Sequence, residues 1–196
     1  MKKKRIYILN GHPAATSLSR TFAETYARSA RLAGHETRMS HLSDMRFDTD
    51  FGCAGFADAK ALEPALERVL EDIEWSEHVV MTSPMWWGGL PAKLKGLIDR
   101  AFLPGRTFDT KLVKNGLPRP MLSGRTARII LTSDTPGWFM RLVYKNALFH
   151  QLGRQIFGFV GLKPVKFTHF SAASHPVPNA VDRWIRKVEK IGSNGL

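Results

Sequence analysis

The chain has 196 residues, of which 43% are hydrophobic and 23% charged, so it is long enough for one well-buried domain and short for two. This composition excludes a largely disordered chain, and we expect a single domain over residues 1–196. A single cysteine, Cys53, excludes an internal disulfide. The histidines are scattered along the chain, so we expect no metal site.

The net charge of +12 is compatible with a solvated basic surface, a surface that attracts phosphorylated ligands, or nucleic-acid binding. Most of the excess lies between residues 90 and 170, where the basic residues are spread singly. This spread disfavours nucleic acid as a partner, because such binding uses clustered basic residues interleaved with aromatic ones. No apolar run is long enough to span a bilayer, so we expect no stable membrane insertion and a cytoplasmic location.

Strand patterns and helix patterns alternate along the chain. Short apolar runs predict strands over residues 5–10, 35–40, 78–83, 125–132 and 165–170. Apolar residues at helical spacing predict helices over residues 17–34, 60–75, 138–157 and 179–191, and another from about 91 to just before Pro104. Residues 44–57 have no clear period and predict a long connection, whereas residues 106–123 predict a surface excursion.

This alternation implies right-handed crossovers and a parallel sheet covered on both faces. Five strands favour the order 2-1-3-4-5, the flavodoxin-like α/β fold, which is a three-layer sandwich. In such a sheet the carboxyl ends of strands one, three and four lie side by side, where ligands bind. The loops at these ends are residues 11–19, 83–89 and 132–137, and their residue types are the least typical of ordinary connecting loops in the chain. We therefore expect them to form one site.

The second of these loops places two large aromatic side chains, Trp86 and Trp87, directly after Pro84 and Met85 and beside Gly88-Gly89. Glycine lets a backbone approach a ligand closely, so the loop favours a flat cofactor lying against it. The alternative is that both rings are core residues beneath an ordinary turn. Adjacent residues do not readily point the same way, which disfavours burial of both rings.

The first loop delivers hydroxyl groups to the start of a predicted helix, at Thr16, Ser17 and Ser19. Unpaired backbone N–H groups and the helix dipole favour a phosphate there, and His12 could donate a further hydrogen bond. The alternative is a simple serine cap with a turn histidine. The chain has neither a Walker-type phosphate loop nor a Gly-x-Gly-x-x-Gly motif, so the pattern favours a mononucleotide phosphate beside an aromatic-walled ring site.

Several motifs in and around these loops form a recognisable set. They are Asn10-Gly11-His12-Pro13, Thr16-Ser17-Leu18-Ser19, Pro84-Met85-Trp86-Trp87-Gly88-Gly89-Leu90-Pro91-Ala92, Leu94-Lys95-Gly96 and Ile98-Asp99-Arg100. This set resembles the NAD(P)H dehydrogenase (quinone) family of flavodoxin-like flavoproteins. The resemblance covers nearly the whole chain, and the proline–tryptophan loop is its most specific part.

The resemblance implies a bound flavin and two-electron reduction of quinones by NADH or NADPH in a ping-pong mechanism. FMN is expected rather than FAD, because no adenosine site is evident, and a homodimer with sites at the subunit interface is implied. By this likeness the first loop would hold the flavin phosphate and the second would run along the isoalloxazine edge, whereas the third would face its pyrimidine end. The residues so implied are His12, Ser17, Leu18 and Ser19, then Pro84, Met85, Trp86 and Trp87, then Thr132, Ser133, Asp134 and Thr135.

The third loop departs from the family pattern. Relatives commonly carry Thr-Thr-Gly-Gly there, whereas this chain has Thr132-Ser133-Asp134-Thr135-Pro136-Gly137, and the Tyr and His of mammalian quinone reductases have no clear counterparts. Their proton-relay role therefore does not transfer. We expect Asp134 to turn toward backbone N–H groups as a helix cap rather than to contact the flavin. Candidates for the substrate-pocket walls are Trp87, Phe108, Trp138 and Tyr144.

Two other functions share the same fold. A one-electron flavodoxin carrier usually meets its partners through an acidic surface, which the charge of +12 disfavours. A regulatory flavoprotein that acts on a membrane transporter is similar to some members of the family and stays open as an alternative.

Overall fold

The computed structural model describes residues 2–114 and 116–196 and contains a parallel sheet of five strands. Its order is β2-β1-β3-β6-β7, which confirms the predicted order 2-1-3-4-5. All four strand pairs are parallel and run without a register shift. The strands are β1 (Arg5–Asn10), β2 (Glu36–His41), β3 (His78–Pro84), β6 (Thr126–Thr132) and β7 (Val165–Phe170).

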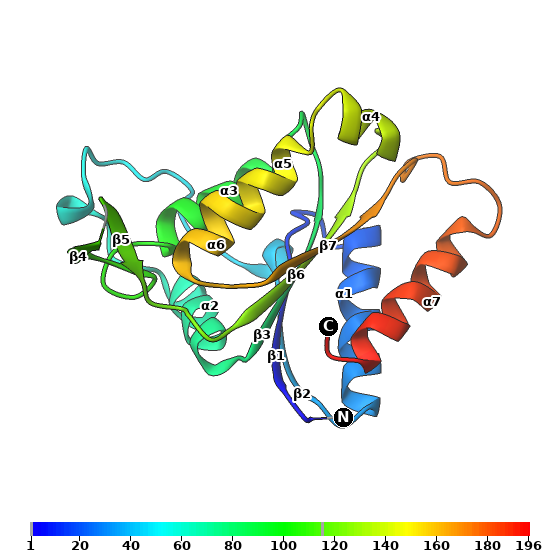
Figure 1. Cartoon of the computed structure of the whole chain (residues 1–196), viewed down its shortest axis with the longest axis horizontal. Coiled ribbons are helices and arrows are strands. Elements are labelled where there is room, and N and C mark those ends of the chain that lie inside the picture. Colours follow the sequence, from blue (N-terminus) through cyan, green and yellow to red (C-terminus); the bar gives the residue numbers. More distant parts are fainter. Residues whose placement is uncertain (1, 115) are drawn as a thin grey trace.

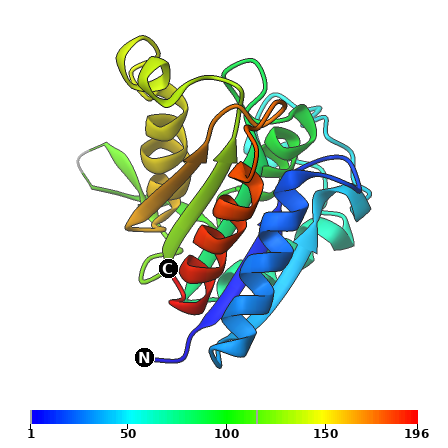
Figure 2. The same cartoon turned by 90° about the vertical axis from the view of Figure 1, so that its right-hand side faces the viewer.

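Helices cover both faces of the sheet, as Figure 1 shows. Helices α1 (Leu18–Leu32) and α7 (Ala180–Ser193) lie together on one face and stand in front of the sheet in Figure 2. Helices α2 (Pro64–Trp75) and α3 (Ala92–Ala101) lie on the other. Because both faces are covered, β3 is buried along its whole length. Helix α2 begins at Pro64 rather than at residue 60, since a proline suits the first turn of a helix.

Backbone hydrogen bonds join the loops at the carboxyl ends of neighbouring strands. Gly11 N–H donates to the Thr82 carbonyl at 2.7 Å, and Met85 N–H donates to the Thr132 carbonyl at 2.8 Å. Gly11 must be a glycine for this approach, because a Cβ there would lie 2.5 Å from Leu94 Cδ2 and 3.0 Å from the Thr82 oxygen. The three predicted loops are therefore held side by side by the sheet itself.

The connection between β2 and α2 is irregular, as predicted, apart from two short 3₁₀ turns at Leu42–Asp44 and Phe56–Asp58. Arg100 of α3 holds it in place. This guanidinium is 1% exposed and donates to the carbonyls of Asp48 at 2.6 Å and Ala61 at 3.0 Å, and it pairs with Glu63 at 3.0 Å. The connection is thus a fixed part of the face that carries α2 and α3.

The predicted single helix over residues 138–157 is wrong, because the chain breaks it into pieces. Helix α4 (Gly137–Leu142) ends in a turn, and helix α5 (Ala147–His150), a π-helical stretch (Gln151–Ile156) and helix α6 (Phe157–Val160) follow. Lys145 and Asn146 have φ of 48° and 55° in that turn, a left-handed backbone that ends a helix. The break lets α4 stand away from the body, at the top of Figure 1.

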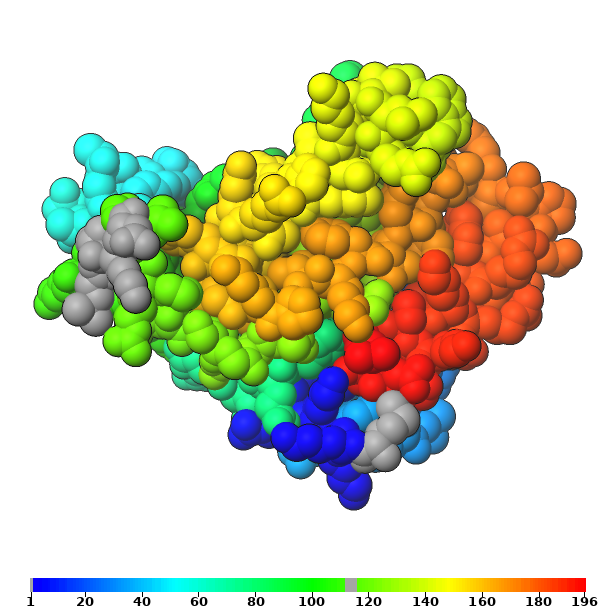
Figure 3. Space-filling model, viewed as in Figure 1, coloured from blue at the N-terminus to red at the C-terminus, as the bar shows by residue number. Residues whose placement is uncertain are grey.

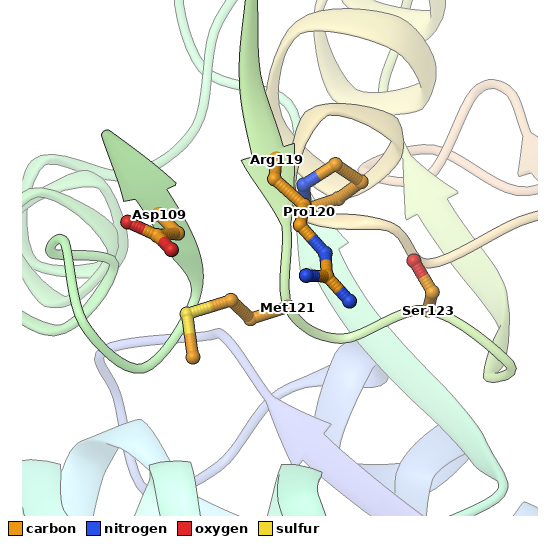
Figure 4. A pocket seen from close by; sticks show the side chains of 5 residues that line it. All are labelled: Asp109, Arg119, Pro120, Met121 and Ser123. Carbon is orange, nitrogen blue, oxygen red and sulfur yellow. The ribbon is translucent and has the colours of Figure 1, made fainter. Parts of the chain in front are cut away.

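The predicted surface excursion contains an antiparallel hairpin of β4 (Phe108–Lys114) and β5 (Leu117–Pro120). It lies at the far left of Figure 1. A hollow of about 480 Å³ at this hairpin is lined by Asp109, Arg119, Pro120, Met121 and Ser123. Figure 4 shows these side chains. Figure 1 places this hairpin far from α4 and from the carboxyl ends of the strands.

Within the part of the chain that the structure describes, no helix combines the length and the apolar character needed to cross a bilayer.

Candidate functional site

The three loops line two adjoining hollows at the carboxyl edge of the sheet. The narrow hollow, of about 190 Å³, is lined by His12, Leu18, Ser19, Pro84, Met85, Trp86, Thr132, Ser133, Asp134, Ala173 and Ser174. The wide hollow, of about 550 Å³, is lined by Met85, Trp87, Gly88, Ser133, Asp134, Thr135, Met140, Tyr144, Ala147 and Leu148. Met85, Ser133 and Asp134 line both, so the hollows share a wall. The wide one has the volume of a small-molecule pocket, about 300–1,000 Å³.

The first loop presents the start of helix α1 to the narrow hollow. Ser17 caps this helix, because its Oγ accepts a hydrogen bond from Arg20 N–H at 3.1 Å. Ser19 lies two residues further on with 1% of its surface exposed, and its hydroxyl finds no hydrogen-bond partner among the described residues. A buried hydroxyl without a partner is costly, so a ligand that accepts its hydrogen bond would be stabilised here.

His12 adds a second donor to this end of the site. Its Nδ1 accepts a hydrogen bond from Ala14 N–H at 3.0 Å, which leaves the ring hydrogen on Nε2. Burial lowers the pKa of His12, so the ring is neutral at pH 7 and Nε2–H serves as a donor. The ring also packs edge-on against Trp86, with the centroids 5.6 Å apart. Asn10, fully buried, fixes the loop by accepting from His12 N–H at 3.2 Å.

The second loop is a tight turn that holds Trp87 out from the body. Trp86 and Gly89 exchange backbone hydrogen bonds of 3.0 and 2.9 Å, and the two residues between them, Trp87 and Gly88, have φ of 51° and 74°. A turn of this kind normally takes Asn or Gly at its first central position, so Trp87 occupies a strained backbone. Trp86 is 45% exposed and Trp87 fully exposed, so neither ring is a core residue.

The third loop holds its carboxylate away from the helix that follows. Asp134 accepts hydrogen bonds from the Ser174 N–H and hydroxyl, both at 2.8 Å. These bonds lower the pKa of Asp134, so it is ionised and its charge is bound to the loop after β7. The expected turn toward a backbone N–H group is confirmed, but the expected helix cap is wrong, since Pro136 occupies the cap position of α4.

The structure brings together most of the predicted site residues and leaves four aside. Ser17 caps α1 but lines neither hollow. Thr16 is exposed and lines neither hollow, although it precedes the Ser17 cap directly. Phe108, 7% exposed, packs against Phe159 at 5.2 Å in the hairpin region, so it is no wall of this pocket. Trp138 is 61% exposed on α4 and packs on Phe139, outside the lining of the wide hollow. Trp87 and Tyr144 do line that hollow, as predicted.

Sequence reasoning missed two groups of lining residues. Ala173 and Ser174 follow β7, and the rule that placed the other loops could have found them, because the carboxyl end of β7 adjoins that of β6. Met140, Ala147 and Leu148 look like ordinary helix residues. They reach the pocket only because the chain turns back between α4 and α5.

The two hollows suit the two parts of a flavin mononucleotide. The start of α1, with the unpartnered Ser19 hydroxyl and His12 Nε2–H, suits a phosphate. The wide hollow, with Met85, Trp87 and Tyr144 at its walls, suits a flat ring system. Among the residues described, no group of three or more His, Cys, Asp or Glu side chains is arranged to hold a metal ion.

Comparison with known proteins shows what the chain is similar to. The profile of the family described as "Flavodoxin-like fold" matches residues 4–191. An FMN-dependent NADH:quinone oxidoreductase of Polaromonas naphthalenivorans is 31% identical over 133 residues, which cover 65% of this chain and 59% of that protein. The chain spans about half the length of the curated relatives it matches.

Solved structures agree over almost the full chain. Smu.1420 from Streptococcus mutans is 25% identical, with a TM-score of 0.77 over 97% of this chain and 99% of that one. An NAD(P)H:quinone oxidoreductase from Methanothermobacter marburgensis is 20% identical, with a TM-score of 0.81 over 98% of this chain and 97% of that one. At 20% identity, the similarity to the Methanothermobacter marburgensis structure shows a shared fold and no more.

Replacement of Trp87 tests whether its ring belongs to the site or to the core. Because the ring is fully exposed, Trp87→Ala should change the unfolding free energy of the flavin-free protein by no more than about 0.5 kcal/mol. The matched control is Trp184→Ala, which removes a ring stacked on Phe170 at 5.2 Å and should cost about 3 kcal/mol. Urea unfolding measures both, and equal losses would show that Trp87 is a packing residue.

Proposed function

The chain belongs to the family of proteins with the flavodoxin-like fold, and from that membership we propose that it is a flavin-dependent NAD(P)H oxidoreductase that reduces quinones. The observation that carries the proposal is the buried, unpartnered Ser19 hydroxyl at the start of α1, beside a hollow walled by the tryptophan loop. The names of the FMN-dependent NADH:quinone oxidoreductases among its relatives support the choice of acceptor. We propose a cytoplasmic location, where NADH and NADPH are available as reductants.

FMN is the cofactor that these residues would hold. Its phosphate would accept hydrogen bonds from Ser19, from His12 Nε2–H and from the first N–H groups of α1, where the helix dipole favours negative charge. Pro84, Met85 and Trp86 would lie along the ring system. When bound, a flavin takes up a hydride at N5 and passes it on.

The third loop would tune the charge around the ring. Reduction adds negative charge at the pyrimidine end of a flavin, which backbone N–H groups stabilise and a nearby carboxylate opposes. Ser174 engages both oxygens of Asp134, so the repulsive charge is tied to the loop after β7. The ionised Asp134 is thereby compatible with a flavin site.

The reductant and the acceptor would use, in turn, the part of the wide hollow that the flavin ring leaves open. Trp87, Met140, Tyr144 and Leu148 are among its lining residues. We propose that both molecules occupy the same part of this hollow, so that the nicotinamide leaves before the quinone enters. A ping-pong mechanism follows from this arrangement.

Steady-state kinetics of the FMN-loaded protein test the activity. Oxidation of NADH or NADPH with a soluble benzoquinone should show parallel lines in double-reciprocal plots, because the two substrates share one hollow. Trp87→Ala should raise the KM for both substrates together, since the ring walls the shared opening. Bound FMN without any quinone turnover would contradict the proposed enzyme activity.

A charge at the helix cap tests where the phosphate binds. Asp caps a helix as well as Ser does, so Ser17→Asp should keep the fold while it places a negative charge beside the phosphate. The variant should weaken FMN binding by about tenfold or more through like-charge repulsion, with riboflavin little affected. Ser17→Asn is the matched control, because it caps the helix without a charge. Flavin fluorescence titration measures all three proteins, and equal losses for FMN and riboflavin would place the phosphate elsewhere.

We propose that a second copy of the chain covers the apolar surface of α4. Trp138, Leu142, Val143 and Tyr144 form this patch and are each 48% to 64% exposed. The segment projects from the body beside the wide hollow, at the top of Figure 3. A contiguous apolar patch of this kind is typical of an interface, and its position would place the partner next to the pocket.

Sedimentation tests this interface. The wild-type protein should sediment with twice the chain mass of 22.0 kDa at micromolar concentration. Leu142→Glu should shift it to the monomer, because a charge would be buried in the contact. Leu32→Glu is the control, since Leu32 is 84% exposed at the end of α1 and lies outside the patch. A wild-type monomer, or equal shifts in both variants, would argue against the α4 interface.

A further inference from the structure

A serine and a histidine form a hydrogen-bonded pair behind the wide hollow. Ser133 Oγ lies 2.8 Å from His169 Nε2, although the two residues are 36 positions apart in the chain. Ser133 is 6% exposed and lines both hollows, whereas His169, on β7, is half-buried. The pair therefore links the cavity to the outer edge of the sheet.

The reaction needs such a link, because it consumes a proton. Reduction of a quinone by NADH takes one hydride from the nicotinamide and one further proton, and yields a hydroquinone and NAD⁺. The hydride comes from the reductant, whereas the proton comes from solvent, and a polar group that borders the cavity can deliver it to the quinone oxygen. Asp134 is ionised and bound to Ser174, so it has no proton to give.

We propose that His169 and Ser133 carry this proton to the acceptor. Water gives a proton to His169 Nδ1 while Nε2 releases its own to Ser133 Oγ. The Ser133 hydroxyl passes its hydrogen to the quinone oxygen in the same event. The serine ends as an alcohol and the histidine ends neutral with its hydrogen on Nδ1, so one proton has moved from solvent to product. Release of the Nδ1 hydrogen to water and uptake of another at Nε2 return the ring to its starting tautomer. This inference rests on the proposed quinone reductase function.

The surroundings of the ring suit this role. Phe149 packs edge-on against His169 with centroids 5.9 Å apart, which fixes the ring so that Nε2 points to Ser133. Burial lowers the pKa of His169, so the ring is neutral at pH 7 and can accept and release a proton in turn. The charged or titratable side chains on the elements around it are Arg128, Asp134, His150, Arg154, Lys166 and His175. Burial, not any of these, lowers the pKa of His169.

Stopped-flow kinetics of the FMN-loaded protein separate the proton from the hydride. His169→Gln and Ser133→Ala should each slow reoxidation by a benzoquinone about 100-fold, the usual contribution of a positioned acid. In His169→Gln, reduction by NADH, which moves a hydride and no separate proton, should keep its rate, and so should FMN affinity. Ser133→Ala is measured at saturating FMN, because Ser133 lines both hollows. His150→Gln is the matched control, because His150 is exposed on α5 and touches neither hollow. Equal slowing of both half-reactions, or of neither, would overturn the relay.

Tyr144 is the rival proton donor, since its hydroxyl belongs to a residue that lines the wide hollow. Tyr144→Phe is therefore measured beside the other variants. Slow reoxidation in Tyr144→Phe, with normal reoxidation in His169→Gln, would give the role to the tyrosine and refute the proposal.

NMR of the flavin-free protein measures the tautomer and the pKa of His169, and so tests the Ser133–His169 hydrogen bond without any activity assay. The neutral His169 ring should carry its hydrogen on Nε2, and Ser133→Ala should change the pKa and the tautomer balance of this ring alone. A hydrogen fixed on Nδ1 would mean that Ser133 donates to the ring, which overturns the proposed direction of transfer. If the loaded protein reduces no quinone but the ring behaves as expected, the proposed function fails and the Ser133–His169 coupling stands.

Discussion

The parallel register of the sheet is the constraint on which the site depends. Because β1, β3, β6 and β7 are parallel neighbours, their carboxyl ends meet at one edge, and the backbone continues this pairing past the strands. Gly11 N–H reaches the Thr82 carbonyl, Met85 N–H the Thr132 carbonyl, and Ser133 N–H the Phe170 carbonyl at 3.0 Å. Each loop is positioned by the strand beside it, so residues far apart in sequence line one cavity.

The site divides its chemistry between a polar end and an apolar end. At the polar end the start of α1 offers unpaired donors, and the buried Ser19 hydroxyl lacks a partner among the residues described. At the other end the tight Trp87-Gly88 turn and the turn between α4 and α5 place rings at the mouth of the wide hollow. Trp87 and Lys145-Asn146 have a left-handed backbone, so a strained turn positions the residues on each of these two segments. Strained turns cluster at functional sites.

The sequence alone predicted the features that depend on local pattern, such as strands and a helix cap. It did not predict the features that depend on contacts between distant segments. Strand β1 and the sheet order follow from alternation, and the Ser17 cap follows from a serine placed before a helical pattern. Nothing local marks the break at Lys145-Asn146, because the flanking residues keep helical spacing. The prediction that Phe108 lines the pocket was wrong, because it packs against Phe159. The sequence pattern around a buried core aromatic does not differ from that around a pocket-lining one. The Ser133–His169 pair depends on the register of β6 with β7, which no single segment reveals.

The central claim is that the three loops hold FMN. The most direct measurement is the visible absorption spectrum of the purified protein, followed by mass analysis of whatever heat denaturation releases. We expect a yellow protein, or one that becomes yellow with added flavin, that releases FMN at one molecule per chain. A colourless protein with no measurable affinity for FMN would contradict it.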